Sequence, residues 1–192
     1  MNKMTTKTKI LIIISVVCLL GCKASNVAQQ SKTATLVGSL ISEEIKQYGQ
    51  FVGEWDCEIS NLQKDGTWVT SNASWRFEYI LGGTAIQDYW INPTNSSDSN
   101  ETLLGTNIRT FNPKENKWEC VWLENKSKKI NGIWKSHQDV NKNILLYDDT
   151  GNWLITFYNI TENSFDWKWD FEQEDGSMKT MSKMKAERII YR

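Results

Sequence analysis

Residues 164–172 read SFDWKWDFE, so aromatic and charged side chains alternate along this stretch. Successive side chains of a β-strand point to opposite faces, which puts all four rings on one face of the predicted strand. These rings are Phe165, Trp167, Trp169 and Phe171. A single opposing layer of small side chains does not cover four large rings, so we expect them to face a wide interior enclosed by other strands.

The same alternation recurs along most of the chain and is interrupted by turn-forming residues. Asp65-Gly66 and Asp175-Gly176 are two such turns, because aspartate followed by glycine accepts the positive φ angles of tight hairpins. The pattern predicts ten strands, at residues 51–59, 67–80, 84–91, 103–111, 117–124, 130–140, 143–147, 152–160, 164–172 and 177–188. We therefore expect an all-β protein, a closed antiparallel up-and-down β-barrel of about ten strands, since closure removes exposed sheet edges.

One stretch, residues 36–50, has helical spacing instead. Its apolar residues recur at intervals of three and four between Leu36 and Tyr48. We expect one short N-terminal helix, which either plugs one end of the barrel or lies against its outside.

The first 21 residues have the features of a secretory signal peptide. Three lysines precede an apolar run at residues 10–20 that is too short to span a bilayer. The run ends in Leu19-Leu20-Gly21-Cys22, which resembles the bacterial lipobox. This resemblance implies that Cys22 is acylated, becomes the first mature residue and holds the protein to a membrane. The alternatives are an ordinary signal with a chance cysteine, or an uncleaved anchor.

The sequence thus divides into a lipoprotein signal peptide at residues 1–21, a flexible tether at residues 22–35 and a barrel domain at residues 36–192. Lys23 stands where an inner-membrane retention signal of enteric bacteria has aspartate, which by resemblance predicts a cell-envelope protein anchored in the outer membrane. The net charge is -1 and both signs are mixed along the chain, so we expect no nucleic-acid partner.

Two short motifs resemble the lipocalin and calycin superfamily. They are Gly53-Glu54-Trp55 on the first predicted strand and Ala186-Glu187-Arg188 on the last. The resemblance implies that the Trp55 ring packs beneath the Arg188 guanidinium and that the two residues act as a structural clasp at one barrel end. A cation over an indole face contributes about 0.5–2 kcal/mol.

The span 51–188 also resembles a bacterial family of lipocalin-like proteins of unknown function. The matching stretches are VGEW (52–55), WRF (75–77), LGGTAIQDYW (81–90), the span 105–113 and SFDW (164–167). That family resembles the nitrobindins, ten-stranded barrels that hold haem through a histidine near the chain end. The only histidine here is His137, which puts haem binding in doubt. We expect no cofactor.

Asp88 and Arg109 are the polar residues hardest to assign to the surface. Asp88 shares a predicted face with Trp90, and a buried carboxylate needs a cationic or hydrogen-bonding partner, which Arg109 could supply. The pair either orients the polar head of a ligand or fixes strand register as a buried structural pair; alternatively, Arg109 is exposed. The full set of predicted ligand-binding residues is Asp88, Trp90, Arg109, Trp118, Trp122, Trp167 and Trp169.

Cys57 and Cys120 remain once Cys18 leaves with the signal peptide and Cys22 takes the lipid. Both alternate with tryptophans, so we expect them to face inward, either as a disulfide in an oxidising envelope or as separate buried thiols. Two cysteines and His137 lack the usual spacing of zinc ligands, so we expect no metal site. No nucleophile motif lies beside His137, which predicts a surface or mouth position.

These patterns favour a lipid-anchored envelope protein whose barrel binds a small apolar or amphipathic molecule without catalysis. Two alternatives stay open. One is an enzyme that acts on a lipophilic substrate inside the barrel; the other is a barrel filled by its own rings that serves as an accessory subunit of another envelope protein. The sequence leaves the ligand and the oligomeric state open.

Overall fold

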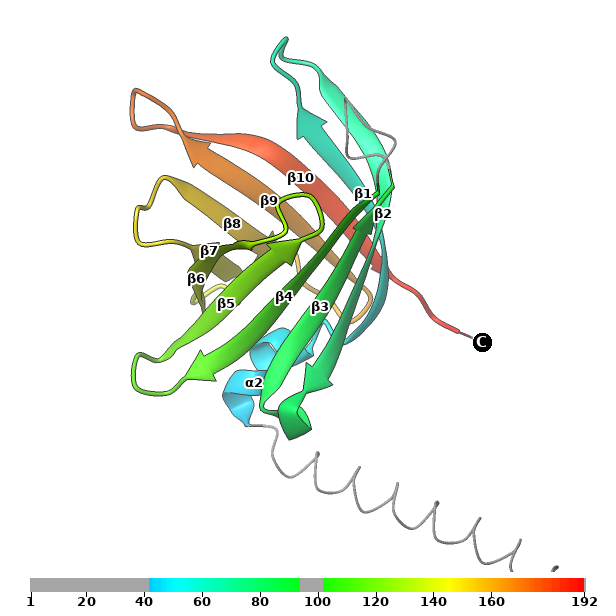
Figure 1. Ribbon diagram of the computed structural model, residues 1–192, viewed down its shortest axis with the longest axis vertical. Helices are drawn as coiled ribbons and strands as arrows, with labels where there is room; N and C mark the ends of the chain where they lie inside the picture. Colours follow the sequence, from blue (N-terminus) through cyan, green and yellow to red (C-terminus); the bar gives the residue numbers. More distant parts are fainter. Residues whose placement is uncertain (1–41, 94–101, 192) are drawn as a thin grey trace, which may run out of the picture. The chain divides into compact units, whose positions relative to one another are not determined.

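Ten antiparallel strands form a closed barrel (Figure 1). The computed structural model describes residues 42–93 and 102–191. The elements are α2 (Glu43–Gly49), β1 (Gly53–Leu62), β2 (Trp68–Ile80), the 3-10 turn η1 (Leu81–Gly83), β3 (Ala85–Asn92), β4 (Leu103–Asn112), β5 (Lys117–Glu124), β6 (Ile130–Gln138), β7 (Ile144–Tyr147), β8 (Trp153–Tyr158), β9 (Ser164–Glu172) and β10 (Met178–Arg188). Each strand pairs with the next along the chain, and β10 pairs with β1. The predicted closed up-and-down barrel is confirmed.

The hairpin turns follow the chemistry of their aspartate–glycine pairs. Gly66 and Gly176 have φ angles of +86° and +79°, a region that glycine adopts without a steric cost. Asp65 accepts a hydrogen bond from the backbone N–H of Thr67 at 3.0 Å. These local bonds stop one strand and start the next without help from the rest of the fold.

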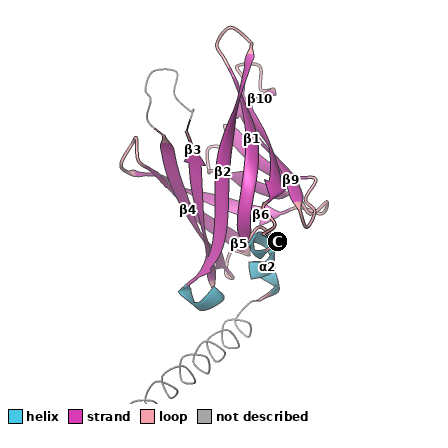
Figure 2. Cartoon of the chain, turned by 90° about the vertical axis from the view of Figure 1, so that its right-hand side faces the viewer, coloured by secondary structure: helices cyan, strands magenta, loops and turns pink. Residues whose placement is uncertain are grey.

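The helix α2 plugs one end of the barrel, where it lies in both views (Figure 1 and Figure 2). Ser42 caps it by accepting the backbone N–H of Ile45 at 3.4 Å. The buried Tyr48 ring packs edge-on against Trp118 at a centroid distance of 4.9 Å. The hydroxyls of Tyr48 and Ser136 are hydrogen-bonded at 2.8 Å. Of the two placements predicted for the helix, the structure therefore has the plug.

Several predicted segments lie outside the described residues. They are the signal peptide at 1–21 with the Cys22 acylation site, the tether at 22–35 and the start of the predicted helix at 36–41. The described residues belong to one compact unit. Within the described ranges, no helix is both long enough and apolar enough to cross a bilayer.

Aromatic rings fill the half of the barrel that lies next to α2. The buried ring of Phe51 follows the helix and packs against Phe77, Phe157 and Phe165 at centroid distances of 5.6, 5.2 and 4.9 Å. Because these rings come from β2, β8 and β9, they join opposite sides of the wall. This end of the barrel is therefore a packed core.

The outward face of β9 is less exposed than its alternation predicts. Asp170 points away from the interior and is nevertheless buried. Its carboxylate accepts a hydrogen bond from the Thr180 hydroxyl and pairs with the Lys168 ammonium, both at 2.6 Å. A register shift in β10 directly after Thr180 accompanies this contact. Thr180 and Lys168 cover the Asp170 carboxylate, so this side chain is shielded from solvent although it points outward.

Candidate functional site

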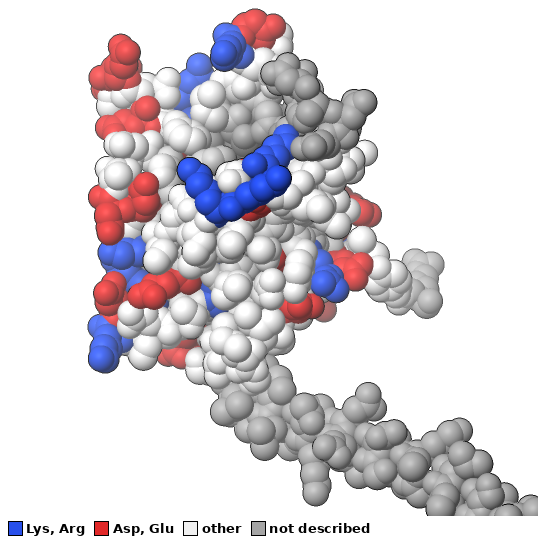
Figure 3. Space-filling model, in the orientation of Figure 1, with Lys and Arg blue, Asp and Glu red and all other residues white. Residues whose placement is uncertain are grey.

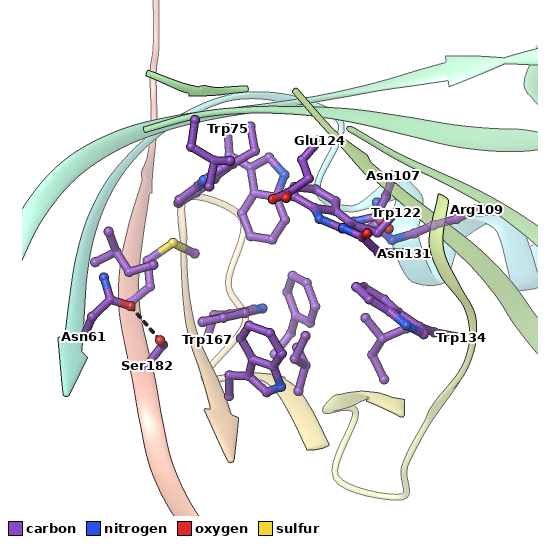
Figure 4. A pocket seen from close by; sticks show the side chains of 18 residues that line it. Asn61, Trp75, Asn107, Arg109, Trp122, Glu124, Asn131, Trp134, Trp167 and Ser182 are labelled. Atoms are coloured by element: carbon purple, nitrogen blue, oxygen red, sulfur yellow. Dashed lines mark hydrogen bonds between the residues drawn. The ribbon is translucent and has the colours of Figure 1, made fainter. Parts of the chain in front are cut away.

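The barrel interior holds a cavity of about 360 Å³ beyond the packed half (Figure 4). Its lining includes residues at the strand ends far from α2, such as Leu103 at the start of β4 and Glu124 at the end of β5. Six of the lining residues are tryptophans: Trp75, Trp90, Trp122, Trp134, Trp167 and Trp169. The cavity is thus an aromatic cup whose base is the packed core.

Polar side chains gather at the open end of this cavity, which we call the mouth. Asn61, Glu124 and Asn131 lie there, at or near the ends of β1, β5 and β6. The Ser182 hydroxyl donates a hydrogen bond of 2.6 Å to the side-chain oxygen of Asn61 (Figure 4). A molecule in the cavity would meet indoles on its sides and amide, hydroxyl and carboxylate groups at the mouth.

A buried ion pair between Asp88 and Arg109 forms the floor on one side. One Asp88 oxygen pairs with the Arg109 guanidinium, and the other accepts the backbone N–H of Asn107 at 3.2 Å. The guanidinium carbon lies 4.8 Å from the centroid of the Tyr48 ring, which belongs to α2. Burial by itself would lower the pKa of Arg109, but the charge of Asp88, the neighbouring Tyr48 and Cys120 groups and the hydrogen bond to Asp88 together outweigh burial and raise this pKa. The opposite charges of this ion pair offset each other, so the floor offers no net charge to a ligand.

The structure brings five of the seven predicted ligand-binding residues to the cavity. They are Trp90, Arg109, Trp122, Trp167 and Trp169. Asp88 lies behind Arg109 and does not line the cavity. Trp118 is fully buried next to α2, where its indole N–H donates to the Gln47 side chain at 3.1 Å. Trp118 belongs to the plugged end because it lies near the start of β5. Trp122 lies four residues further along the same strand, closer to the mouth.

Sequence reasoning missed Trp75 and Trp134 as lining residues, although both alternate with polar neighbours. It also missed Gly105, whose lack of a side chain leaves room for the Trp122 ring. A Cβ atom added to Gly105 on β4 would meet the Trp122 ring on β5. The signal in the sequence was a glycine within a predicted strand, because such a glycine often marks a position where another group approaches the backbone closely.

Trp55 and Arg188 lie together at the plugged end. The guanidinium carbon of Arg188 is 4.1 Å from the centroid of the Trp55 ring. Arg188 also donates to the backbone oxygens of Val52 and Gln50 at 2.6 and 2.7 Å. A Cβ on Gly53 would approach the guanidinium to 2.6 Å, so the glycine makes room for it. The two residues join the first and last strands, and neither of them lines the cavity.

Cys57 and Cys120 are free, buried thiols on β1 and β5. Burial raises the pKa of each to about 12, with a further contribution from the charge of Asp56 at Cys57. Such thiols stay protonated and unreactive at neutral pH. Across residues 42–93 and 102–191, no three histidine, cysteine or acidic side chains cluster as metal ligands. His137 lies outside the cavity, beside Tyr147 on the outer face.

The barrel is similar to two solved structures of low sequence identity. One is the S-type phycobiliprotein lyase CPES from Guillardia theta, with a TM-score of 0.55 and 10% identity over 79% of this chain and 99% of that one. The other is Rv2717c from M. tuberculosis, with a TM-score of 0.55 and 10% identity over 78% of this chain and 99% of that one. No family model and no curated protein matches the sequence. The likenesses show a shared lipocalin-like barrel fold, while the nitrobindin resemblance stays a prediction.

Proposed function

We propose that this protein is a lipid-anchored envelope protein whose barrel binds a small apolar or amphipathic molecule and does no chemistry on it. The observation that carries the proposal is the tryptophan-lined cavity. Its volume of about 360 Å³ falls within the range of small-molecule pockets, about 300–1,000 Å³. The lipobox-like sequence at Cys22 supports the anchor, and Lys23 after it supports the expected outer-membrane location.

The chemistry of the lining favours a ligand with an apolar body. Indoles offer broad flat faces, and burying apolar surface between them is favourable by roughly 25 cal/mol per Å². An open cavity of this size also counts against the alternative in which the barrel is filled by its own rings. The ligand is therefore expected to occupy the cup between β2, β5, β6 and β9.

The distribution of polar groups sets the orientation of an amphipathic ligand. Arg109 at the floor is already compensated by Asp88, so the floor offers no uncompensated charge. The accessible polar groups of Asn61, Glu124 and Asn131 lie at the mouth instead. We infer that the apolar end of the ligand enters first and that its polar head stays at the mouth.

An enzyme acting on a lipophilic substrate is the second candidate. It is supported by one observation, that a protein of the same fold is named a phycobiliprotein lyase. Against it stands the position of Asp88, which is fully buried and paired with Arg109 and so cannot reach a molecule in the cavity. An Asp88→Asn variant that binds a substrate but fails to turn it over would favour the enzyme.

A cavity-filling variant tests the binding proposal. Wild-type protein should bind at least one of a long-chain fatty acid, a polycyclic aromatic compound or haem, with a saturable change in calorimetry and tryptophan fluorescence. Ile155→Trp adds an indole to the cavity lining and should abolish that binding, whereas Ile133→Trp adds the same group to the outer face and should leave it unchanged. The absence of saturable binding to every probe would refute the proposal.

A further inference from the structure

The outer face of the barrel carries exposed aliphatic side chains on β3, β4 and β6, within a run of four neighbouring strands. Ile91 on β3, Leu104 and Ile108 on β4, and Ile130 and Ile133 on β6 are between 38% and 69% exposed. We call these five residues the aliphatic wall. Single exposed apolar residues are common on protein surfaces, so the wall is informative only because its members are contiguous.

The strand register makes the wall continuous. Ile91 pairs with Leu104 across β3 and β4. Ile108 pairs with Val121 of β5, which in turn pairs with Ile133. Leu123 of β5 pairs with Ile130 and with Thr106, which lies between Leu104 and Ile108 on the same face. Neighbouring residues on one face of a sheet touch across strands, so Leu123 joins these side chains into one largely apolar surface. It spans four strands, from β3 to β6.

Positive charge borders this surface at the mouth end. The turn between β5 and β6 carries Lys126, Lys128 and Lys129, and Figure 3 shows lysine side chains gathered over this turn, above an area without charged side chains. Glu119 and Lys135 are the next charged residues on the outward face of β5 and β6, at the other end. The wall is thus apolar with one basic edge.

We propose that the aliphatic wall and its lysine turn dock against a bilayer that contains anionic phospholipid. Apolar side chains beside lysines are the combination that interfacial lipid binding uses, because the chains enter the headgroup boundary while the ammonium groups meet anionic lipid. Protein interfaces depend instead on tryptophan, tyrosine and arginine anchors, whereas the five wall residues are isoleucine and leucine. The neighbouring Tyr89 is already engaged by Arg76 over its ring and by the hydrogen bond from its hydroxyl to Glu78. The closed barrel also has no free strand edge onto which a partner strand could add.

Docking in this way brings the cavity to the lipid. The lysine turn lies between Glu124 and Asn131, which both line the mouth. A barrel resting on the wall with the lysines in the headgroup region therefore opens its mouth at the membrane surface. The docking proposal does not depend on ligand binding, and either can fail without the other.

Label quenching in full-length protein tests the wall separately from the N-terminal anchor. An environment-sensitive fluorophore is attached at Ile133→Cys on the wall, or at Lys185→Cys, an exposed position on β10. The protein is reconstituted into vesicles of phosphatidylglycerol and phosphatidylcholine that contain a spin-labelled phospholipid. Labelled protein without an added cysteine supplies the background, since Cys57 and Cys120 are buried.

We expect stronger quenching at Ile133→Cys than at Lys185→Cys. The triple change K126Q/K128Q/K129Q should lower the docked-to-undocked ratio by about fivefold per lysine, and phosphatidylcholine alone should weaken docking in the same direction. Circular dichroism checks that each variant is folded. Equal quenching at the two positions overturns the proposal. Protection of the Ile133→Cys label that depends on protein concentration and not on lipid also overturns it, and assigns the wall to a second copy of the chain.

Discussion

Asp88 and Arg109 form an ion pair across β3 and β4 in the barrel interior. Both are almost completely buried, and each makes a further contact in addition to the ion pair. Asp88 accepts the Asn107 N–H, and Arg109 lies over the Tyr48 and Phe77 rings. Removing two charges from water costs several kcal/mol per ion, which only good pairing offsets. The pair therefore holds β3 and β4 in one register next to the plug, and its structural role does not require a ligand.

Loss of one partner should be far more costly than loss of both. Arg109→Met leaves the Asp88 carboxylate buried without a cation and should lower the free energy of unfolding by about 3–5 kcal/mol. The double variant D88L/R109M should recover most of this loss, because apolar side chains need no partner there. Urea unfolding measures both changes.

The matched control for Arg109→Met is Arg76→Met. Arg76 and Glu78 form an exposed pair with an N–O distance of 3.7 Å, so its loss should change stability by less than about 1 kcal/mol. If Arg109→Met were no more destabilising than Arg76→Met, the buried pair would not have the role assigned to it.

At the scale of elements, the fit between β4 and β5 shapes the cavity. The Trp122 ring of β5 lies over Gly105 of β4, where any side chain would collide with it. Trp118, on the same face of β5, instead packs against α2 through Tyr48 and Gln47. The strand β5 thus contributes one indole, Trp118, to the plugged end and another, Trp122, to the cavity. Gly105 on the neighbouring strand sets the position of the Trp122 ring.

Gly105→Ala should displace Trp122 into the cavity. Overpacking of this kind typically lowers the free energy of unfolding by about 1–3 kcal/mol, and the displaced ring should also weaken binding of any probe that the wild type binds. Denaturant unfolding and calorimetry report the two effects. Leu104→Val, on the adjacent outward position, is the control and should leave binding unchanged; equal binding by Gly105→Ala and wild type would argue against this packing.

At the scale of the whole molecule, closure of the sheet buries groups that titrate freely in the unfolded chain. Cys57 and Cys120 lie on separate strands, and both are enclosed because the barrel has no open side. Burial raises the pKa of each thiol from 9.0 to about 12. The native barrel therefore keeps two protons that the unfolded chain releases in mildly alkaline solution.

The free energy of unfolding should fall as the pH rises above 9. Between pH 9 and 12 the unfolded state binds fewer protons than the native state, so each thiol removes about 1.4 kcal/mol of stability per pH unit. Below pH 9 both states hold the protons and the effect vanishes. Urea unfolding from pH 8 to 10 measures the slope, which Cys57→Ala and Cys120→Ala together should reduce, while buried tyrosines such as Tyr48 retain a part of it towards pH 10. An unchanged slope in that double variant would contradict this origin.

The sequence by itself determined the strands, their inward and outward faces and the closed barrel, because these depend on local alternation and on turn residues such as Asp65 and Gly66. The predicted strands at residues 117–124 and 164–172 have the same bounds in the structure. Alternation fixes the face of a side chain and does not fix its height along the barrel axis. Only the tertiary structure therefore decided that Trp118 packs in the plug while Trp122 lines the cavity, that Asp88 lies behind Arg109, and that outward residues such as Ile108 and Ile133 join into one surface, since each of these depends on neighbours distant in sequence.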